Sequence, residues 1–229
     1  MKEYVQGVRD SLPVMLGVIP FGITCGVMGL TAGLTPLETV AMSMLVFAGA
    51  AQFISITMLG AGITSWGLIV FTTLLINLRH LLMGASLAQQ LLRLPLARQL
   101  LITFALTDEA YAITTNKMAT AGYSAGHQLG SSWALYFTWV TSTIAGVLVG
   151  SYIPDPLAWG LDFAMPATFL AMLMPRLTNP VSIAVCLVAA VTAVAGAALL
   201  PGKWYIIAAC LAASITGGIL EKADDEHAF

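Results

Sequence analysis

Long apolar segments separated by short polar breaks run along almost the whole chain. About 20 consecutive apolar residues are enough for a helix to cross a membrane. The pattern predicts eight such segments: Leu12–Leu30, Pro36–Leu59, Ser65–Leu92, Gln99–Met118, Gln128–Tyr152, Pro156–Met174, Val181–Leu200 and Trp204–Leu220. The breaks are short and rich in turn residues, so they leave no room for a soluble domain. We expect an all-α polytopic protein with about six to eight transmembrane segments, a single membrane domain over residues 1–229 and an acidic tail at 221–229.

The composition supports the same class of protein. Hydrophobic residues make up 59% of the chain and charged residues only 9%, whereas a soluble domain has about 25% charged residues. The formal net charge of −2 gives no reason to expect nucleic acid as a partner. Cys25, Cys186 and Cys210 all fall in apolar segments without paired spacing, so we expect neither disulfides nor a metal site, and no cofactor.

An internal repeat is indicated when the two halves of the chain are compared. The block Phe47–Phe53, FAGAAQF, resembles Phe163–Phe169, FAMPATF, in which Pro166 favours a break in the helix and Asp162 lies just before. We therefore predict repeat halves at residues 11–120 and 128–220. Such weak internal symmetry is typical of secondary transporters, which bind substrate where the repeats meet.

The distribution of Lys and Arg bears on whether this repeat is inverted. If all eight segments span, five of these residues lie inside and three outside. If Pro36–Leu59 and Pro156–Met174 are instead broken or re-entrant, six lie inside and two outside. The second arrangement agrees better with the positive-inside rule and would make the repeats inverted.

The block Phe47–Phe53 has two interpretations. It holds only small residues and Gln52 between its aromatic ends, so another helix can approach its backbone closely. If the helix is interrupted here, the free N–H groups around Gly49 and the amide of Gln52 would suit a substrate carboxylate. In the alternative, the block is a packing face and Gln52 is a hydrogen-bonding link between helices.

The segment Ser65–Leu92 carries Asn77, Arg79 and His80 near its middle. A charged residue at the centre of a membrane helix costs about 2.5–3.5 kcal/mol, so it is rare without a partner or a function. The next segment contains Asp108 and Glu109, also near its middle. At 100° per residue these two carboxylates point in different directions, so we expect only one of them to pair with Arg79.

Helical spacing extends this expectation to neighbouring side chains. Thr72, Arg79 and Ser86 share one face of their helix, and Asp108 shares a face with Tyr111 and Thr115. The ion pair can be functional or can simply fix two helices. His80 can belong to a hydrogen-bond network or carry a proton, for which the ordinary histidine pKa is suitable.

Other histidines and the known enzyme motifs add little. His127 and His227 fall at loop and tail positions, and we assign them no role. The chain has no Gly-x-Ser-x-Gly, His-Glu-x-x-His or phosphate-binding Gly-Lys loop, and Ser86 and His80 lie on different faces of one helix. We therefore do not expect an enzyme.

Four short motifs occur together in one order and spacing: Ile19–Gly22, Phe47–Phe53, Asn77–His80 followed by Met83-Gly84, and Thr107–Tyr111. In this combination the chain resembles the AzlC-like family, the large subunit of bacterial branched-chain amino acid exporters. The resemblance covers nearly the whole chain, although the second half carries fewer motifs. It implies export of Leu, Ile or Val, with Met as a further candidate, across the bacterial inner membrane. It also implies a small AzlD-like membrane subunit as partner.

The candidate site follows from the polar residues of the apolar segments. For substrate binding we predict Gly49, Gln52, Asn77, Arg79 and Tyr111, and for proton coupling His80, Asp108 and Glu109. A branched-chain amino acid needs receptors for its carboxylate and its ammonium group within an apolar pocket, and this set contains both. The alternatives are a non-transporting membrane scaffold, whose charges only hold helices or a partner, and a channel.

Overall fold

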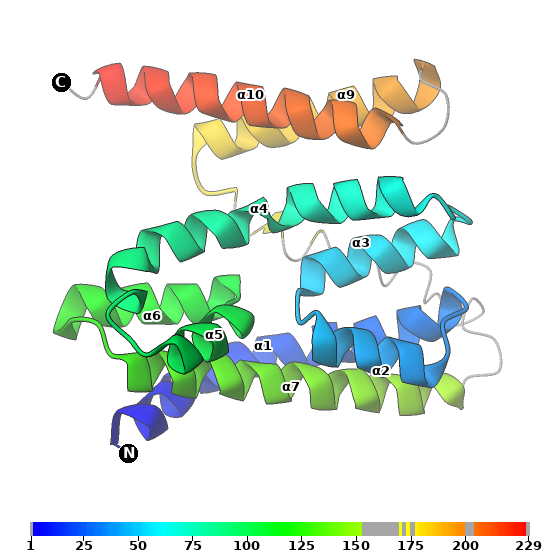
Figure 1. Ribbon diagram of the computed structural model, residues 1–229. Coiled ribbons are helices and arrows are strands. Elements are labelled where there is room, and N and C mark those ends of the chain that lie inside the picture. The colour runs from blue at the N-terminus through cyan, green and yellow to red at the C-terminus, as the bar shows by residue number, and fades with distance from the viewer. Residues whose placement is uncertain (1, 153–169, 171–172, 175–176, 200–203, 228–229) are drawn as a thin grey trace. The chain divides into compact units, whose positions relative to one another are not determined.

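The computed structural model describes residues 2–152, 170, 173–174, 177–199 and 204–227 (Figure 1). The chain divides into two compact units, residues 1–165 and 166–229. The first unit contains α1 (Lys2–Thr31), α2 (Pro36–Leu45), α3 (Gly49–Gly60), α4 (Trp66–Leu91), α5 (Leu96–Phe104), α6 (Asp108–Ala121) and α7 (Ala125–Ser151). The second unit contains α9 (Pro180–Leu199) and α10 (Trp204–His227), which pack against each other.

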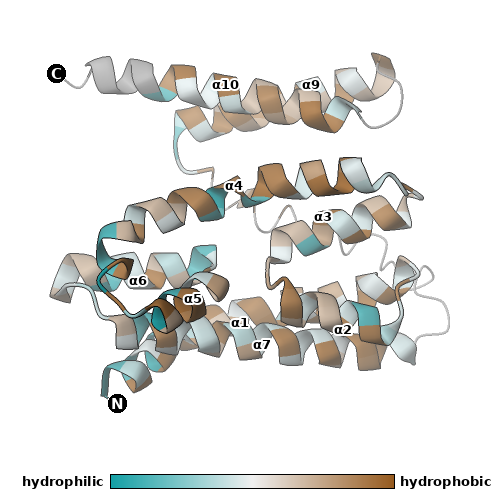
Figure 2. Cartoon of the chain, in the orientation of Figure 1, coloured by the Kyte–Doolittle hydropathy of each residue, from teal (hydrophilic) through white to brown (hydrophobic). Residues whose placement is uncertain are grey.

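Helices account for almost all of the described residues, and none of these residues forms a strand. Five helices, α1, α4, α7, α9 and α10, are long and apolar enough to cross a membrane. Many large apolar side chains are exposed. Apolar positions, brown in Figure 2, run along much of these helices. The prediction of an all-α polytopic membrane protein is confirmed.

The core of the first unit is the contact between α1 and α7, which lie side by side (Figure 1). Glycines line this contact, and they allow the two backbones to touch. A Cβ atom on Gly26 would lie 2.3 Å from the backbone oxygen of Thr143, and one on Gly146 would lie 2.1 Å from that of Ile23. Close approach through small residues is a main source of helix association in lipid, where burial of apolar surface contributes little.

The predicted segment Pro36–Leu59 is divided into two helices. Thr35 begins α2 through a capping box with Glu38, and α2 ends at Leu45. Phe47 then adopts a left-handed backbone conformation, with φ of 45°, and α3 begins at Gly49. The interruption that we considered near the block Phe47–Phe53 is therefore present, at the start of that block.

The predicted segment Gln99–Met118 is also divided, and here the expectation of one continuous segment was wrong. α5 ends at Phe104 and α6 begins at Asp108. The cause is local: the side chain of Thr107 accepts a hydrogen bond from the backbone N–H of Ala110 and so caps a new helix. Asp108 and Glu109 then occupy its first turn, where the helix dipole stabilises negative charge.

The second copy of the predicted repeat, residues 163–169 with Asp162 before it, lies outside the described residues. The repeat halves 11–120 and 128–220 therefore stay a prediction.

The glycine contacts predict how sensitive the α1–α7 contact is to added volume. Gly26→Ala should lower the stability of the detergent-solubilised protein by about 1–3 kcal/mol, because the new methyl group meets backbone that cannot rotate away. The matched control is Gly17→Ala on the same helix, where nothing lies within 4 Å of the added atom. Thermal unfolding compares the two, and equal melting temperatures would contradict the assigned packing.

Candidate functional site

An ion pair between Arg79 and Asp108 joins the middle of α4 to the start of α6. The two side chains are only partly buried, with 30% and 20% of their surfaces exposed. One further polar contact lies on the same helix faces, since Ser86 Oγ donates to the Tyr111 hydroxyl at 3.0 Å. The structure therefore confirms the predicted facing of these two helices and selects Asp108, rather than Glu109, as the partner of Arg79.

His80 and Glu109 belong to the same charged cluster. His80 follows Arg79 on α4 and lies within electrostatic range of both Asp108 and Glu109. Glu109 is half-buried and, one position after Asp108, points about 100° away from the ion pair. The structure thus brings together the three residues predicted to handle protons, His80, Asp108 and Glu109, around one arginine.

The polar stretch of α4 carries side-chain atoms that no described residue satisfies. Thr72 Oγ1, Asn77 Oδ1 and Arg79 Nε are buried, and each lacks a hydrogen-bond partner. Leaving one such group unpaired costs about 1–3 kcal/mol, so native proteins seldom keep several together without reason. Thr72 and Arg79 share one face of α4, which suits a polar ligand or water there, whereas Asn77 lies on another face of the helix.

The start of α3 comes level with this polar stretch. α3 and α4 pack as a helical hairpin joined by residues 61–65. Gly49 is eleven residues before the end of α3 at Gly60, and Asn77 is eleven residues after the start of α4 at Trp66. With equal rise per residue, the first turn of α3 therefore lies at about the same level along the hairpin as Asn77. Its cap residue, Ala48, provides no side-chain hydrogen bond, so the N–H groups of that turn lack a side-chain cap.

The N-termini of α3 and α6 thus both lie at the level of this stretch of α4. For α3 this follows from the residue count in the hairpin, and for α6 from the ion pair between Asp108 and Arg79. Hydrophilic positions in the middle of α4 and in the first turn of α6 are visible in Figure 2. Helix N-termini carry partial positive charge and favour anions. Asp108 already partly neutralises the N-terminus of α6, whereas α3 has no acidic residue in its first turn.

Gln52 lies at the centre of a buried hydrogen-bond network. Its amide nitrogen donates to Ser43 Oγ at 2.8 Å, and its amide oxygen accepts from the Trp139 indole at 3.1 Å. Ser43 in turn contacts Thr143 of α7 at 3.0 Å. Gln52 is 1% exposed, and these contacts favour the interpretation in which it links helices. Its role in substrate binding stays a prediction, as does that of Gly49, which packs against the ring of Trp139.

His127 does not lie in a loop, as we had placed it. It is in the first turn of α7, 1% exposed, and its Nε2 atom lies 2.9 Å from the carboxylate of Asp10. A signal in the sequence could have located it, because Ser124 caps α7 through the N–H of His127.

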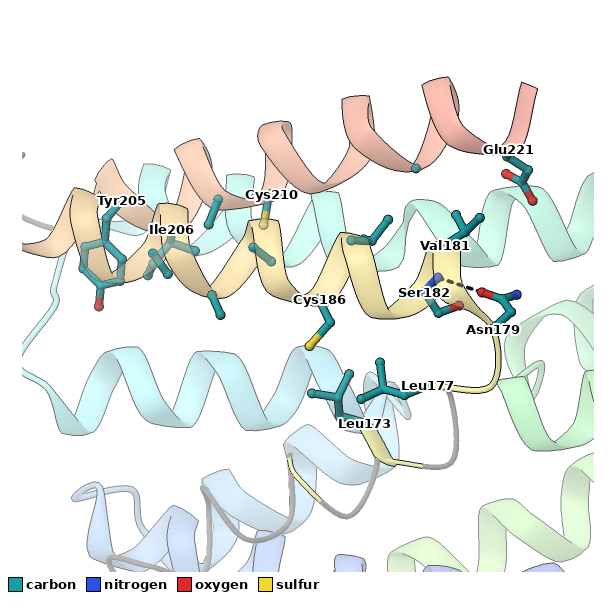
Figure 3. A pocket seen from close by; sticks show the side chains of 16 residues that line it. Leu173, Leu177, Asn179, Val181, Ser182, Cys186, Tyr205, Ile206, Cys210 and Glu221 are labelled. Atoms are coloured by element: carbon teal, nitrogen blue, oxygen red, sulfur yellow. Dashed lines mark hydrogen bonds between the residues drawn. The ribbon is translucent and has the colours of Figure 1, made fainter. Parts of the chain in front are cut away.

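A separate pocket of about 970 Å³ occurs in the second unit, lined mainly by α9 and α10 (Figure 3). Its walls are mostly apolar, with Asn179, Ser182, Tyr205 and Glu221 as polar groups. None of the predicted site residues lines it. Among the residues that the structure describes, no cluster of His, Cys, Asp or Glu could hold a metal ion.

Comparison with known proteins identifies related chains. Over 220 residues the chain is 31% identical to the inner membrane protein YgaZ of Escherichia coli, covering 93% of this chain and 89% of that protein. It is 35% identical over 175 residues to an uncharacterized membrane protein of Archaeoglobus fulgidus, with 75% of each chain covered. It is 26% identical over 209 residues to the branched-chain amino acid transport protein AzlC of Bacillus subtilis, covering 88% of this chain and 79% of that protein.

No solved structure matches the chain significantly. The family described as AzlC protein matches residues 13–153, a range that includes both broken helices, the polar stretch of α4 and the Asp108 turn of α6. This match covers more than half of the 229 residues and agrees with the resemblance carried by the four sequence motifs. The chain belongs to the AzlC family of membrane proteins, which are implicated in branched-chain amino acid transport.

Proposed function

We propose that this chain is the large subunit of an exporter that moves Leu, Ile, Val and Met out of the cell across the inner membrane in exchange for protons. It acts in this proposal with a small AzlD-like membrane subunit. The observation that carries the proposal is the Arg79–Asp108 ion pair, bordered by unpartnered polar atoms of α4 and by the uncapped first turn of α3.

An amino acid zwitterion matches the charges of this site. Its carboxylate would bind the guanidinium of Arg79 and the N–H groups at the start of α3, beside Gly49. Its ammonium group would bind Asp108, with Tyr111 lining the same face of α6, and Asn77 Oδ1 would bind substrate or water on another face of α4. The substrate would then replace each member of the ion pair by an equivalent charge, so neither Arg79 nor Asp108 would be left unpaired in the membrane.

The specificity for branched side chains would come from the apolar surroundings. Apart from its polar stretch, α4 consists largely of Leu, Ile and Val, and Met83 and Leu87 are buried one and two turns beyond His80. A ligand site with mostly apolar walls and a few polar groups is the usual arrangement for a small molecule of this size.

Proton coupling is assigned to the groups beside the ion pair. Glu109 points away from Arg79 and so can change its protonation state while Asp108 remains paired. His80 lies within electrostatic range of both carboxylates and would pass a proton on. In this scheme Asp108 changes partner during transport, whereas Glu109 carries the proton.

Two alternatives make different predictions for transport. A membrane scaffold would use the ion pair only to join α4 to α6 and would give no substrate-dependent flux. A channel would conduct substrate without moving it against a gradient.

Removing either charge of the ion pair should strongly reduce efflux. We expect Asp108→Asn and Arg79→Gln each to reduce efflux of preloaded labelled valine by about tenfold or more, because a hydrogen bond to a charged group is worth about 1.5–3 kcal/mol. Efflux is measured in cells that also express the small subunit. The control is Glu38→Gln, a similar substitution at an exposed capping residue.

The outcomes separate the proposed classes of protein. If both variants, Asp108→Asn and Arg79→Gln, show the same valine efflux as wild type, the ion pair has only a structural role. No flux from a well-expressed wild-type complex, with Leu, Ile, Val or Met, would favour the scaffold.

Glu109→Gln should separate substrate movement from proton movement. In liposomes containing the complex, we expect this variant to retain exchange of internal for external valine, because the ion pair is intact. It should lose accumulation driven by a pH gradient, because no carboxylate remains at this position to carry the proton. Loss of both activities together would show that Glu109 is needed for substrate binding, and accumulation equal to that of wild type would exclude it as the coupling group.

A further inference from the structure

Asp10 and His127 form a second titratable pair, outside the site described above. Asp10 lies on α1, and its side chain is 42% exposed, whereas the ring of His127 on α7 is 1% exposed. Their atoms approach to 2.9 Å through Nε2 of the imidazole. One partner is therefore exposed at the surface of the protein, and the other is enclosed between helices.

Unsatisfied polar atoms continue inward from this pair along α7. His127 Nδ1, Gln128 Nε2 and Ser132 Oγ are all buried and have no hydrogen-bond partner among the described residues. The three residues are at most 1% exposed. Gln128 and Ser132 are four residues apart and so lie on one face of the helix. Three unpaired polar groups within two turns indicate a place for buried water rather than a dry helix contact.

The nearby charged groups Glu3 and Lys117 form hydrogen bonds with residues other than Asp10 and His127. Glu3 of α1 accepts a hydrogen bond from Ser124 at 2.6 Å, and Lys117 of α6 donates to Gln6 at 3.3 Å. Tyr123, between α6 and α7, donates its hydroxyl to Gln128 at 2.8 Å, and burial raises the pKa of this tyrosine to about 12. It therefore stays a neutral donor. Arg9, next to Asp10 on α1, is exposed.

We propose that Asp10 and His127 form a proton relay between solvent and the buried polar face of α7. A proton from solvent reaches the exposed carboxylate of Asp10 and passes to Nε2 of the ring. A proton leaves from Nδ1, on the opposite side of the ring, to a water that Gln128 and Ser132 would hold. One proton enters and one leaves, so the ring returns to a neutral form with its two tautomers exchanged. The relay would serve the proposed proton coupling, but its presence can be tested without transport.

The test is a pH titration of the histidine rings by NMR, on the intact protein in detergent with labelled histidine. His127→Gln identifies the signal of His127 by its disappearance, and glutamine retains a polar side chain at the buried position. We expect the wild-type signal to change with pH, because the proposed relay requires the ring to gain and lose a proton. In Asp10→Asn the response of this signal to pH should differ from that of wild type, because the ring loses its carboxylate partner.

Glu3→Gln is the matched control, since it removes a carboxylate from the same end of α1 that bonds Ser124 instead of the imidazole. Its titration should equal that of wild type. A His127 signal that does not change with pH would overturn the proposal, as would equal shifts in the Asp10 and Glu3 variants.

Valine efflux then shows whether the relay is used. Asp10→Asn should shift the pH dependence of efflux in the same direction as the NMR titration, while Glu3→Gln leaves it unchanged. A titrating His127 in a complex without efflux at any pH would leave the relay in place and reject the export proposal. If wild type and Asp10→Asn both export valine with the same dependence on pH, the relay is rejected.

Discussion

A guanidinium in the middle of an apolar helix is stable in a bilayer only when an opposite charge lies beside it, and Asp108 supplies that charge to Arg79. Removing one partner would leave the other charge uncompensated in an apolar segment, which is costly. The position of α6 is therefore tied to that of α4. The break before α6 follows from the same requirement, since it places Asp108 at a helix N-terminus, where an acidic residue is favoured.

Broken helices and small residues perform different tasks in the first unit. The contact between α1 and α7 relies on glycines that let backbones meet, and it provides a rigid support. The breaks before α3 and α6 leave backbone N–H groups without helical partners. In lipid such groups need satisfaction from protein, water or ligand. A transport site can therefore form only where the breaks face other polar groups, and the polar stretch of α4 provides these.

Much of this arrangement could be predicted from the sequence, because the cost of charge in a membrane is large and local. That cost predicted a carboxylate partner for Arg79, and helical spacing predicted the face on which Asp108 and Tyr111 would lie. The break between α5 and α6 escaped prediction because hydropathy reports apolar character and not hydrogen bonding. Only the capping residue Thr107 signalled it. The choice of Asp108 over Glu109 depends on packing that no periodicity encodes.

The role of Gln52 shows a second limit of sequence interpretation. An amide in an apolar helix must find partners, but its position does not say whether these are protein groups or a substrate. The structure places Ser43 and Trp139 within hydrogen-bonding distance, so the amide is satisfied by neighbouring helices. The burial of His127 was not predicted, because this residue lies at the edge of an apolar segment, where histidines are commonly solvated. Only the folded contact of α1 with α7 encloses it.

α6 connects the Arg79–Asp108 ion pair with the region around Asp10 and His127. It begins at Asp108, bonded to Arg79, and ends at Ala121, two residues before the Tyr123 hydroxyl that donates to Gln128. A helix of 14 residues moves largely as a rigid body. If substrate separates Asp108 from Arg79, the resulting displacement of α6 reaches the hydrogen bond between Tyr123 and Gln128, beside the proposed relay. Substrate binding and proton access would then be linked through one short helix.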